Sequence, residues 1–169
     1  MTALATCDNC AVNWWPFKDS GVSSEAKQIT QTYQSDIEQS ATSAEYGAHK
    51  KLIRAMDELC PIFIECQAEN WDGYGAQPIS ESAYINAIEL YMQLPSQYPK
   101  PDITPEPDGA IGFEWYLEPY RTLSFSVRGD NTVIFSALFG INNSDYGDKP
   151  LDETLHPRLH ELLGTLFVD

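Results

Sequence analysis

From Ala110 onward the hydropathy pattern has a period of two residues, and this feature constrains the fold more than any other. Large apolar side chains alternate with small or polar ones in three consecutive runs, 111–117, 123–127 and 133–139. Such alternation is typical of strands that bury one face. Gly129-Asp130-Asn131 separates the second run from the third and favours a tight turn. We therefore expect a three-stranded, or slightly larger, antiparallel meander.

The apolar face of this meander needs a cover, and the remaining chain can supply it as helices. Residues 81–94 carry apolar side chains at helical spacing, and residues 157–167 place leucines on one face. Another helix is expected from about Ser43, with Pro61 interrupting it. The segment 60–66 is then either a kinked continuation or a separate short element. The pattern predicts an α+β fold in which three to four helices cover the sheet.

The sequence predicts an N-terminal extension followed by a core domain. We expect residues 1–42 to form an N-terminal extension with one helix near 24–39, and residues 43–169 to form a single core domain. The aromatic cluster at 14–17 in the extension either packs on the core or anchors a partner. Five prolines between 95 and 109 predict an extended connection across the surface.

The stretch 70–80 contains many residues whose backbone conformation or side-chain size few other residues can reproduce. Asp72 and two nearby glycines favour a tight, folded-back turn, because glycine readily adopts a positive φ. Trp71 and Tyr74 add large apolar faces that each carry one polar atom. The stretch is either a packed connector whose aspartate bonds to its own backbone or a site for a ligand or partner.

The same stretch carries a resemblance. Residues 70–76 read Asn-Trp-Asp-Gly-Tyr-Gly-Ala, Pro78-Ile79 follow, and Glu114-Trp115 opens the strand region. This arrangement resembles a group of uncharacterised bacterial and phage-borne proteins with an NWDGYGA-x-P-I signature, over roughly residues 50 to 140. The resemblance implies a shared fold and a phage- or defence-related context, and it carries no activity with it.

Charge is the most unusual bulk property. The chain has 25 acidic and 10 basic side chains and a net charge of −15, and residues 55–99 contain no lysine or arginine. Nucleic-acid binding needs basic groups that displace phosphate counterions, so direct DNA or RNA binding is disfavoured. The same field attracts a basic protein surface, although acidity can also serve solubility alone.

Other classes of protein lose support from the sequence. No apolar run approaches membrane-spanning length, and the N-terminus lacks the pattern of a signal peptide, so we expect a cytoplasmic protein without membrane association. Nucleotide-binding and hydrolase motifs are absent from the sequence, and no cofactor is expected. The oligomeric state is left open.

A metal site has only weak candidates. Cys7 and Cys10 have the spacing of zinc ligands or of a redox pair, and His156 and His160 have the spacing that places two imidazoles on one helical face. The two pairs are far apart in the chain, and Pro157 stands between the histidines. We therefore expect no metal.

Two functional hypotheses follow. The first is a non-enzymatic acidic module that docks on a basic, nucleic-acid-handling protein and acts as an inhibitor. Its expected contacts are Glu69, Trp71, Asp72, Tyr74, Glu114 and Tyr116. The alternative is a small enzyme in which Asp72 and Glu114 form a carboxylate pair with separated pKa values.

Overall fold

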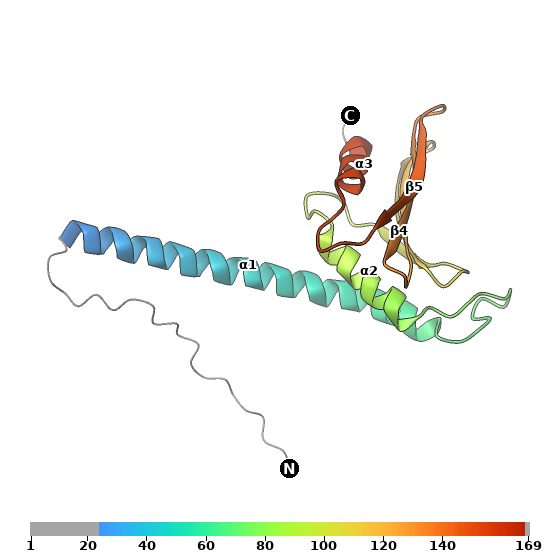
Figure 1. The fold of residues 1–169 in the computed structure, drawn as a ribbon, viewed down its shortest axis with the longest axis horizontal. Coiled ribbons are helices and arrows are strands. Elements are labelled where there is room, and N and C mark those ends of the chain that lie inside the picture. The colour runs from blue at the N-terminus through green and yellow to red at the C-terminus, as the bar shows by residue number, and fades with distance from the viewer. Residues whose placement is uncertain (1–23, 168–169) are drawn as a thin grey trace, which may run out of the picture. The chain divides into compact units, whose positions relative to one another are not determined.

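The computed structural model describes the backbone of residues 24–167 and the side chains of Ser43 and of residues 45–167. Contacts divide the chain into two compact units, residues 1–43 and 44–169. All packing described below belongs to the second unit. The elements in chain order, shown in Figure 1, are α1 (Ser24–Glu65), α2 (Glu81–Gln93), β1 (Asp102–Pro105), β2 (Ile111–Glu118), β3 (Arg121–Val127), β4 (Thr132–Phe139), β5 (Ser144–Pro150) and α3 (Pro157–Phe167).

The sheet is an antiparallel meander of five strands in the order β1-β2-β3-β4-β5. The predicted α+β class is therefore confirmed. Its three central strands, β2 to β4, are the three runs of alternating hydropathy. With the two edge strands, the meander is slightly larger than the three strands that the alternating runs define, which agrees with the expectation of a three-stranded or slightly larger meander.

The edge strand β1 lies within the proline-rich segment for which we predicted only an extended connection. Residues 102–105 pair with 111–114 of β2, and the turn between them contains Gly109. Proline cannot donate to a ladder, but an edge strand has one side without a neighbouring strand. Pro105 is therefore compatible with this position.

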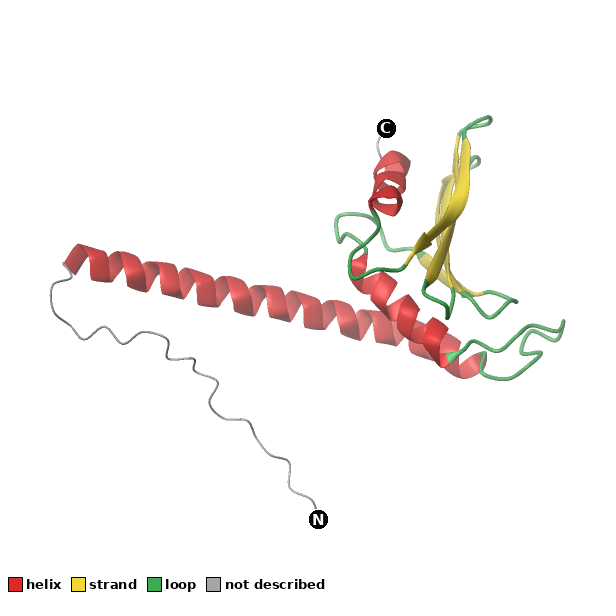
Figure 2. Ribbon diagram, in the orientation of Figure 1, coloured by secondary structure: helices red, strands yellow, loops and turns green. Residues whose placement is uncertain are grey.

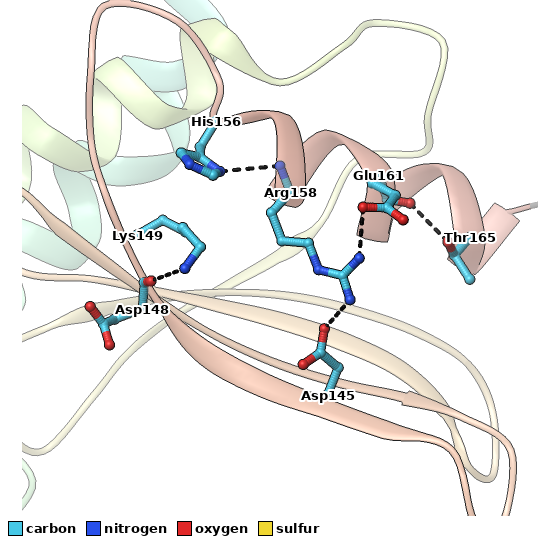
Figure 3. Close-up of polar contacts among 7 residues, drawn as sticks. All are labelled: Asp145, Asp148, Lys149, His156, Arg158, Glu161 and Thr165. Carbon is cyan, nitrogen blue, oxygen red and sulfur yellow. Dashed lines mark hydrogen bonds and ion pairs between the residues drawn. The ribbon is translucent and has the colours of Figure 1, made fainter.

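The other edge strand, β5, lacks apolar alternation. The positions that face the helices hold Asp145, Gly147 and Lys149, which pair across from residues of β4. Asp145 accepts a hydrogen bond at 2.5 Å from Arg158 of α3, which also bonds Glu161 at 2.6 Å (Figure 3). An ion pair thus replaces apolar packing at this edge, so the hydropathy pattern gives no sign of the strand.

One face of the sheet forms the core. Figures 1 and 2 show α2 and α3 on the same side of the sheet. Side chains of α2, α3 and the C-terminal part of α1 join those of the sheet in one cluster. The buried residues contributed by the three central strands are Ile111, Phe113, Trp115, Leu123, Phe125, Val127, Val133, Phe135 and Ala137. The leucine face predicted for 157–167 is confirmed, because Leu159, Leu162, Leu163 and Leu166 are each at most 1% exposed.

Two expectations about the region of α1 are wrong, that of two separate helices and that of an interruption at Pro61. The separate helices expected near 24–39 and from Ser43 are one continuous helix, and it passes through Pro61 to Glu65. Proline removes one backbone donor, and it clashes with the preceding turn. Packing near the proline offsets this cost, because Leu59 is fully buried and the Phe63 ring stacks on Tyr84 with a centroid separation of 4.6 Å.

Both ends of α2 are capped by hydrogen bonds. At its N-terminus the Ser80 hydroxyl accepts a hydrogen bond from the Ala83 amide at 3.1 Å, as expected for an N-cap. At its C-terminus the Lys51 ammonium of α1 donates to the carbonyls of Met92 at 2.8 Å and Leu94 at 2.5 Å. These carbonyls have no partner within the helix, so a cation there is favourable. Partial burial lowers the pKa of Lys51.

Some expectations fall on residues outside the described part of the chain. The aromatic cluster at 14–17, Cys7 and Cys10 belong to this group. Among the residues that are described, no helix combines the length and the apolar character needed to cross a bilayer.

Candidate functional site

The stretch 70–77 closes on itself through its own hydrogen bonds. The Asp72 carboxylate accepts from the backbone amides of Tyr74 at 2.8 Å and Ala76 at 3.1 Å. The Asn70 side-chain carbonyl accepts from the Gly75 amide at 2.7 Å. Asn70, Gly73 and Gly75 adopt φ values of 60°, 79° and 97°. We call this folded segment the corner.

The corner is also fastened to its surroundings. The Trp71 indole donates to the Gln77 carbonyl at 2.9 Å, and the Gln77 amide donates to the Pro107 carbonyl at 2.8 Å. Gly109 approaches so closely that an added Cβ would lie 2.9 Å from the Pro78 carbonyl oxygen. The turn between β1 and β2 therefore packs directly on the corner.

These bonds define the role of Asp72. Amide donors favour the charged carboxylate, and those of Tyr74 and Ala76 lower the pKa of Asp72 below its ordinary value of 3.8. Both amides bind the same carboxylate oxygen, Oδ1, and so fix the orientation of the side chain. Asp72 thus holds the shape of the corner.

The corner still presents side chains outward. Tyr74 is 95% exposed and Glu69 is exposed as well, whereas Trp71 is partly buried through its contact with the core. The remaining predicted residues, Glu114 and Tyr116, lie on β2 instead. No hydrogen bond or ion pair in the described part of the chain joins Asp72 to Glu114. The pairing of these two carboxylates therefore stays a prediction.

The candidate metal ligands that are described have separate roles. The His156 imidazole accepts a hydrogen bond from the Arg158 amide at 3.1 Å and caps the start of α3 (Figure 3). The His160 ring meets the edge of Tyr98 with a centroid separation of 6.4 Å. Within residues 45–167 no group of three or more histidine, cysteine, aspartate or glutamate side chains is arranged to hold a metal ion.

The most distinctive surface of the second unit is the outer face of the sheet. Figures 1 and 2 show no helix of residues 44–167 against this side. Because side chains alternate along a strand, the strand pairing defines its members. The outer face consists of Asp102, Thr104, Gly112, Glu114, Tyr116, Thr122, Ser124, Ser126, Thr132, Ile134, Ser136, Leu138, Ser144, Tyr146, Asp148 and Pro150.

One row of the outer face crosses all five strands. Asp102 pairs with Glu114, Glu114 with Ser124, Ser124 with Ser136, and Ser136 with Tyr146. The row runs from two carboxylates at one edge, over two hydroxyls, to a tyrosine at the other. Since strands lie about 4.8 Å apart, the row spans roughly 19 Å.

The first pair in this row is unfavourable for the free protein. Asp102 and Glu114 are both exposed and stand directly opposite each other on neighbouring strands. Like charges in this arrangement destabilise a sheet. The nearest lysine in sequence, Lys100, forms its salt bridge with Glu58 of α1 at 2.9 Å. Lys100 also attracts Asp102 through space, but no ion pair with Asp102 or Glu114 forms among the described residues.

A third carboxylate reaches the outer face from the turn after β1. The Ser126 hydroxyl donates to Glu106 at 2.6 Å. Glu106 lies across Gly112, where an added Cβ would be only 2.7 Å from its other carboxylate oxygen. The absence of a side chain at Gly112 thus allows Glu106 to lie over the sheet.

The basic side chains of the second unit are mostly engaged within the molecule. Lys51, Lys100 and Arg158 bind the partners already described, and Arg128 pairs with Asp108 at 2.7 Å. Arg121 donates to the Leu166 carbonyl at 3.1 Å. In contrast, Asp102, Glu114 and Asp148 form no salt bridge in the described part of the chain. The charges left available on the outer face are therefore negative.

Only some residues of this surface were predicted from the sequence. We named Glu114 and Tyr116, but Asp102 and Tyr146 belong to the edge strands that we did not recognise. The available signal was the run of small hydroxyl residues at alternate positions, Ser124, Ser126 and Ser136. Such positions on an otherwise apolar meander indicate a face without a cover.

No protein-family model, curated protein or solved structure matches this chain. The resemblance of residues 70–79 to a bacterial and phage-borne group therefore stays a prediction.

The contact between the corner and the turn at Gly109 can be tested by two matched substitutions. Gly73→Ala introduces strain through a φ of 79° but meets no atom within 4 Å, whereas Gly109→Ala at a φ of 83° also collides with the Pro78 carbonyl. We expect Gly109→Ala to lower the free energy of unfolding by about 1–3 kcal/mol more than Gly73→Ala, measured by urea denaturation. Equal losses would contradict the close approach.

The role of Asp72 predicts a specific pH dependence. Because its pKa is lowered on folding, the stabilisation it provides is complete above the ordinary value of 3.8 and is lost as the pH falls through the lowered value. We expect the amide resonances of Tyr74 and Ala76 to shift in that acidic range in an NMR titration. Asp72→Asn removes the titrating group and should abolish this transition. A transition at or above the ordinary value in the unmodified protein would refute the assignment.

Proposed function

We propose that this chain is a non-enzymatic protein-binding module whose outer face docks on a basic protein surface. The observation that carries the proposal is the exposed pair Asp102 and Glu114, two like charges placed opposite each other without a salt bridge between them and a cation. This pair costs stability in the free protein. A cationic side chain of a partner would relieve the repulsion on binding.

The distribution of the other charges supports a basic partner. The net charge of −15 speeds the encounter with a positive surface, and the described basic residues are largely used in internal contacts. Complementary charge raises the association rate and selects among partners more than it raises affinity. The same field opposes direct binding of DNA or RNA.

Two tyrosines supply contacts of another kind. Tyr116 is 59% exposed and Tyr146 is 82% exposed, both on the outer face. Tyrosine is enriched among the residues that dominate binding energy, and its ring attracts lysine and arginine. A shallow hollow beside Tyr146 is lined also by Ile134, Ser136 and Asp148, and by Arg128, whose charge is paired with Asp108. An arginine of the partner fits the chemistry of this hollow, with a ring for its plane and a carboxylate for its charge.

The shape of the outer face suits docking without rearrangement. Its centre carries serine and threonine, whose short side chains leave a low surface over a hydrogen-bonded sheet. Few side chains of this surface have to be ordered when a partner binds. The loss of conformational entropy on binding is therefore small, and that favours affinity. If the partner uses its basic surface to hold a nucleic acid, the module would block that surface and act as an inhibitor.

The proposal predicts how two double substitutions differ. Asp102→Asn with Glu114→Gln removes the two opposed charges of the outer face and leaves Asp148 and Glu106. Asp152→Asn with Glu153→Gln removes the same amount of charge from exposed positions between β5 and α3. With the immobilised chain as bait in a cell lysate, we expect a captured basic protein to bind the first variant about tenfold more weakly and the second almost unchanged. Capture should also fall steeply as salt is raised.

A stability measurement accompanies this experiment. The outer-face variant should be as stable as the unmodified protein or more stable by about 0.2–1 kcal/mol, because like-charge repulsion is removed. Loss of binding then does not result from unfolding. Equal weakening by both double variants would show that net charge alone matters and would contradict docking at the outer face.

A further inference from the structure

A pocket of the opposite character lies on the helix side of the second unit. Its volume is about 140 Å³, and it is bordered by α1, the C-terminus of α2, the segment 94–101 and α3. The residues that decide its chemistry are Lys51, Arg54, Tyr91, Leu94, Trp115 and Leu163. Lys100 also lines the pocket, so its lining holds three cations, although the chain as a whole is strongly acidic. Neither the outer face nor the corner contributes to the pocket.

The apolar walls fit a small ring. Tyr91 and Leu94 are 8% exposed, Trp115 is 4% exposed, and Leu163 is fully buried. For comparison, a protein cavity of about 150 Å³ lined by apolar side chains holds a molecule of benzene. The pocket is therefore of the size of one six-membered ring, with its mouth open to solvent.

Four contacts hold the segment 94–101 in place beside the pocket. The Trp115 indole donates to the Pro99 carbonyl at 2.8 Å, and Lys51 donates to the Leu94 carbonyl. The Tyr98 ring stacks on Phe167 of α3 at 5.3 Å, and the Lys100 ammonium lies 2.9 Å from Glu58. A site fixed in this way needs little ordering when a ligand enters, which favours affinity.

The charges at the pocket differ in availability. Lys100 is neutralised by Glu58, which also accepts a hydrogen bond from Tyr91 at 3.4 Å. Lys51 uses two of its donors on carbonyls and keeps its positive charge without a carboxylate partner. Arg54 is exposed and has no hydrogen bond or ion pair within the described part of the chain. Its planar fork is suited to a carboxylate.

We propose that this pocket binds a small aromatic carboxylate. The ring occupies the space against Tyr91, Leu94 and Trp115, and the carboxylate pairs with Arg54 in the field of Lys51. The long-range repulsion of an anion by the acidic chain is screened beyond about 8 Å at physiological salt, so the local cations decide binding. The proposal is independent of the outer face, and each can fail without the other.

Benzoate is the probe for this proposal, with benzamide as its neutral counterpart of the same shape. In NMR titrations of the full chain at physiological salt, we expect benzoate to shift the Trp115 indole N–H resonance in a saturable way at millimolar concentration. Benzamide should bind at least about tenfold more weakly. Arg54→Gln should weaken benzoate binding about tenfold or more, as expected for the loss of charge-assisted hydrogen bonds.

Lys50→Gln is the matched control, since this exposed lysine precedes Lys51 on the same helix and does not line the pocket. It removes the same charge and should leave benzoate affinity within about twofold. Ser96 lines the mouth and is exposed, so Ser96→Phe should block entry without unfolding the core. The proposal is overturned if benzoate gives no saturable shift, if benzamide binds equally well, or if Lys50→Gln and Arg54→Gln weaken binding alike.

Discussion

The packing of one face of the meander against α2 and α3 is the interaction on which the rest of the structure depends. Phe113, Phe125 and Leu123 from the sheet are fully buried, as are Leu90 of α2 and Leu163 of α3. Each such side chain contributes about 1.5–3 kcal/mol when it leaves water. Because this one face supplies the core, the opposite face does not have to pack against another element, as is common in antiparallel sheets. Its residues can then be selected for binding.

The same division governs the charges. Arg158 links β5 to α3, Arg121 reaches a carbonyl of α3, and Lys51 caps α2, so the cations serve to join elements within the second unit. The carboxylates of the outer face are left without salt-bridge partners in the described part of the chain. In the described part of this acidic chain, Lys100, Arg121, Arg128 and Arg158 form internal ion pairs, and a surplus of negative charge remains on the surface. The pocket beside Arg54 is the exception to this distribution.

The elements that the sequence analysis predicted are those whose burial follows a simple period. Leu159, Leu162 and Leu166 recur at helical spacing, and all are buried. Ile111, Phe113 and Trp115 recur at strand spacing, and they are buried as well. The strand β5 was missed because Asp145 and Lys149 occupy its inward positions and are satisfied by contacts remote in sequence. Pro61 was read as a break because sequence alone does not show the packing around it. The corner was recognised from its glycines and Asp72, whereas the opposition of Asp102 and Glu114 depends on a register that no local pattern encodes.

The central claim is that the outer face, and not acidity in general, recognises cations. The most direct measurement is a titration of the protein with a hexa-arginine peptide, followed through the amide resonances of the whole second unit. We predict that the largest shifts fall along the row from Asp102 and Glu114 to Tyr146. Shifts spread evenly over all exposed carboxylates, including Glu81 and Glu89 on α2, would contradict the account.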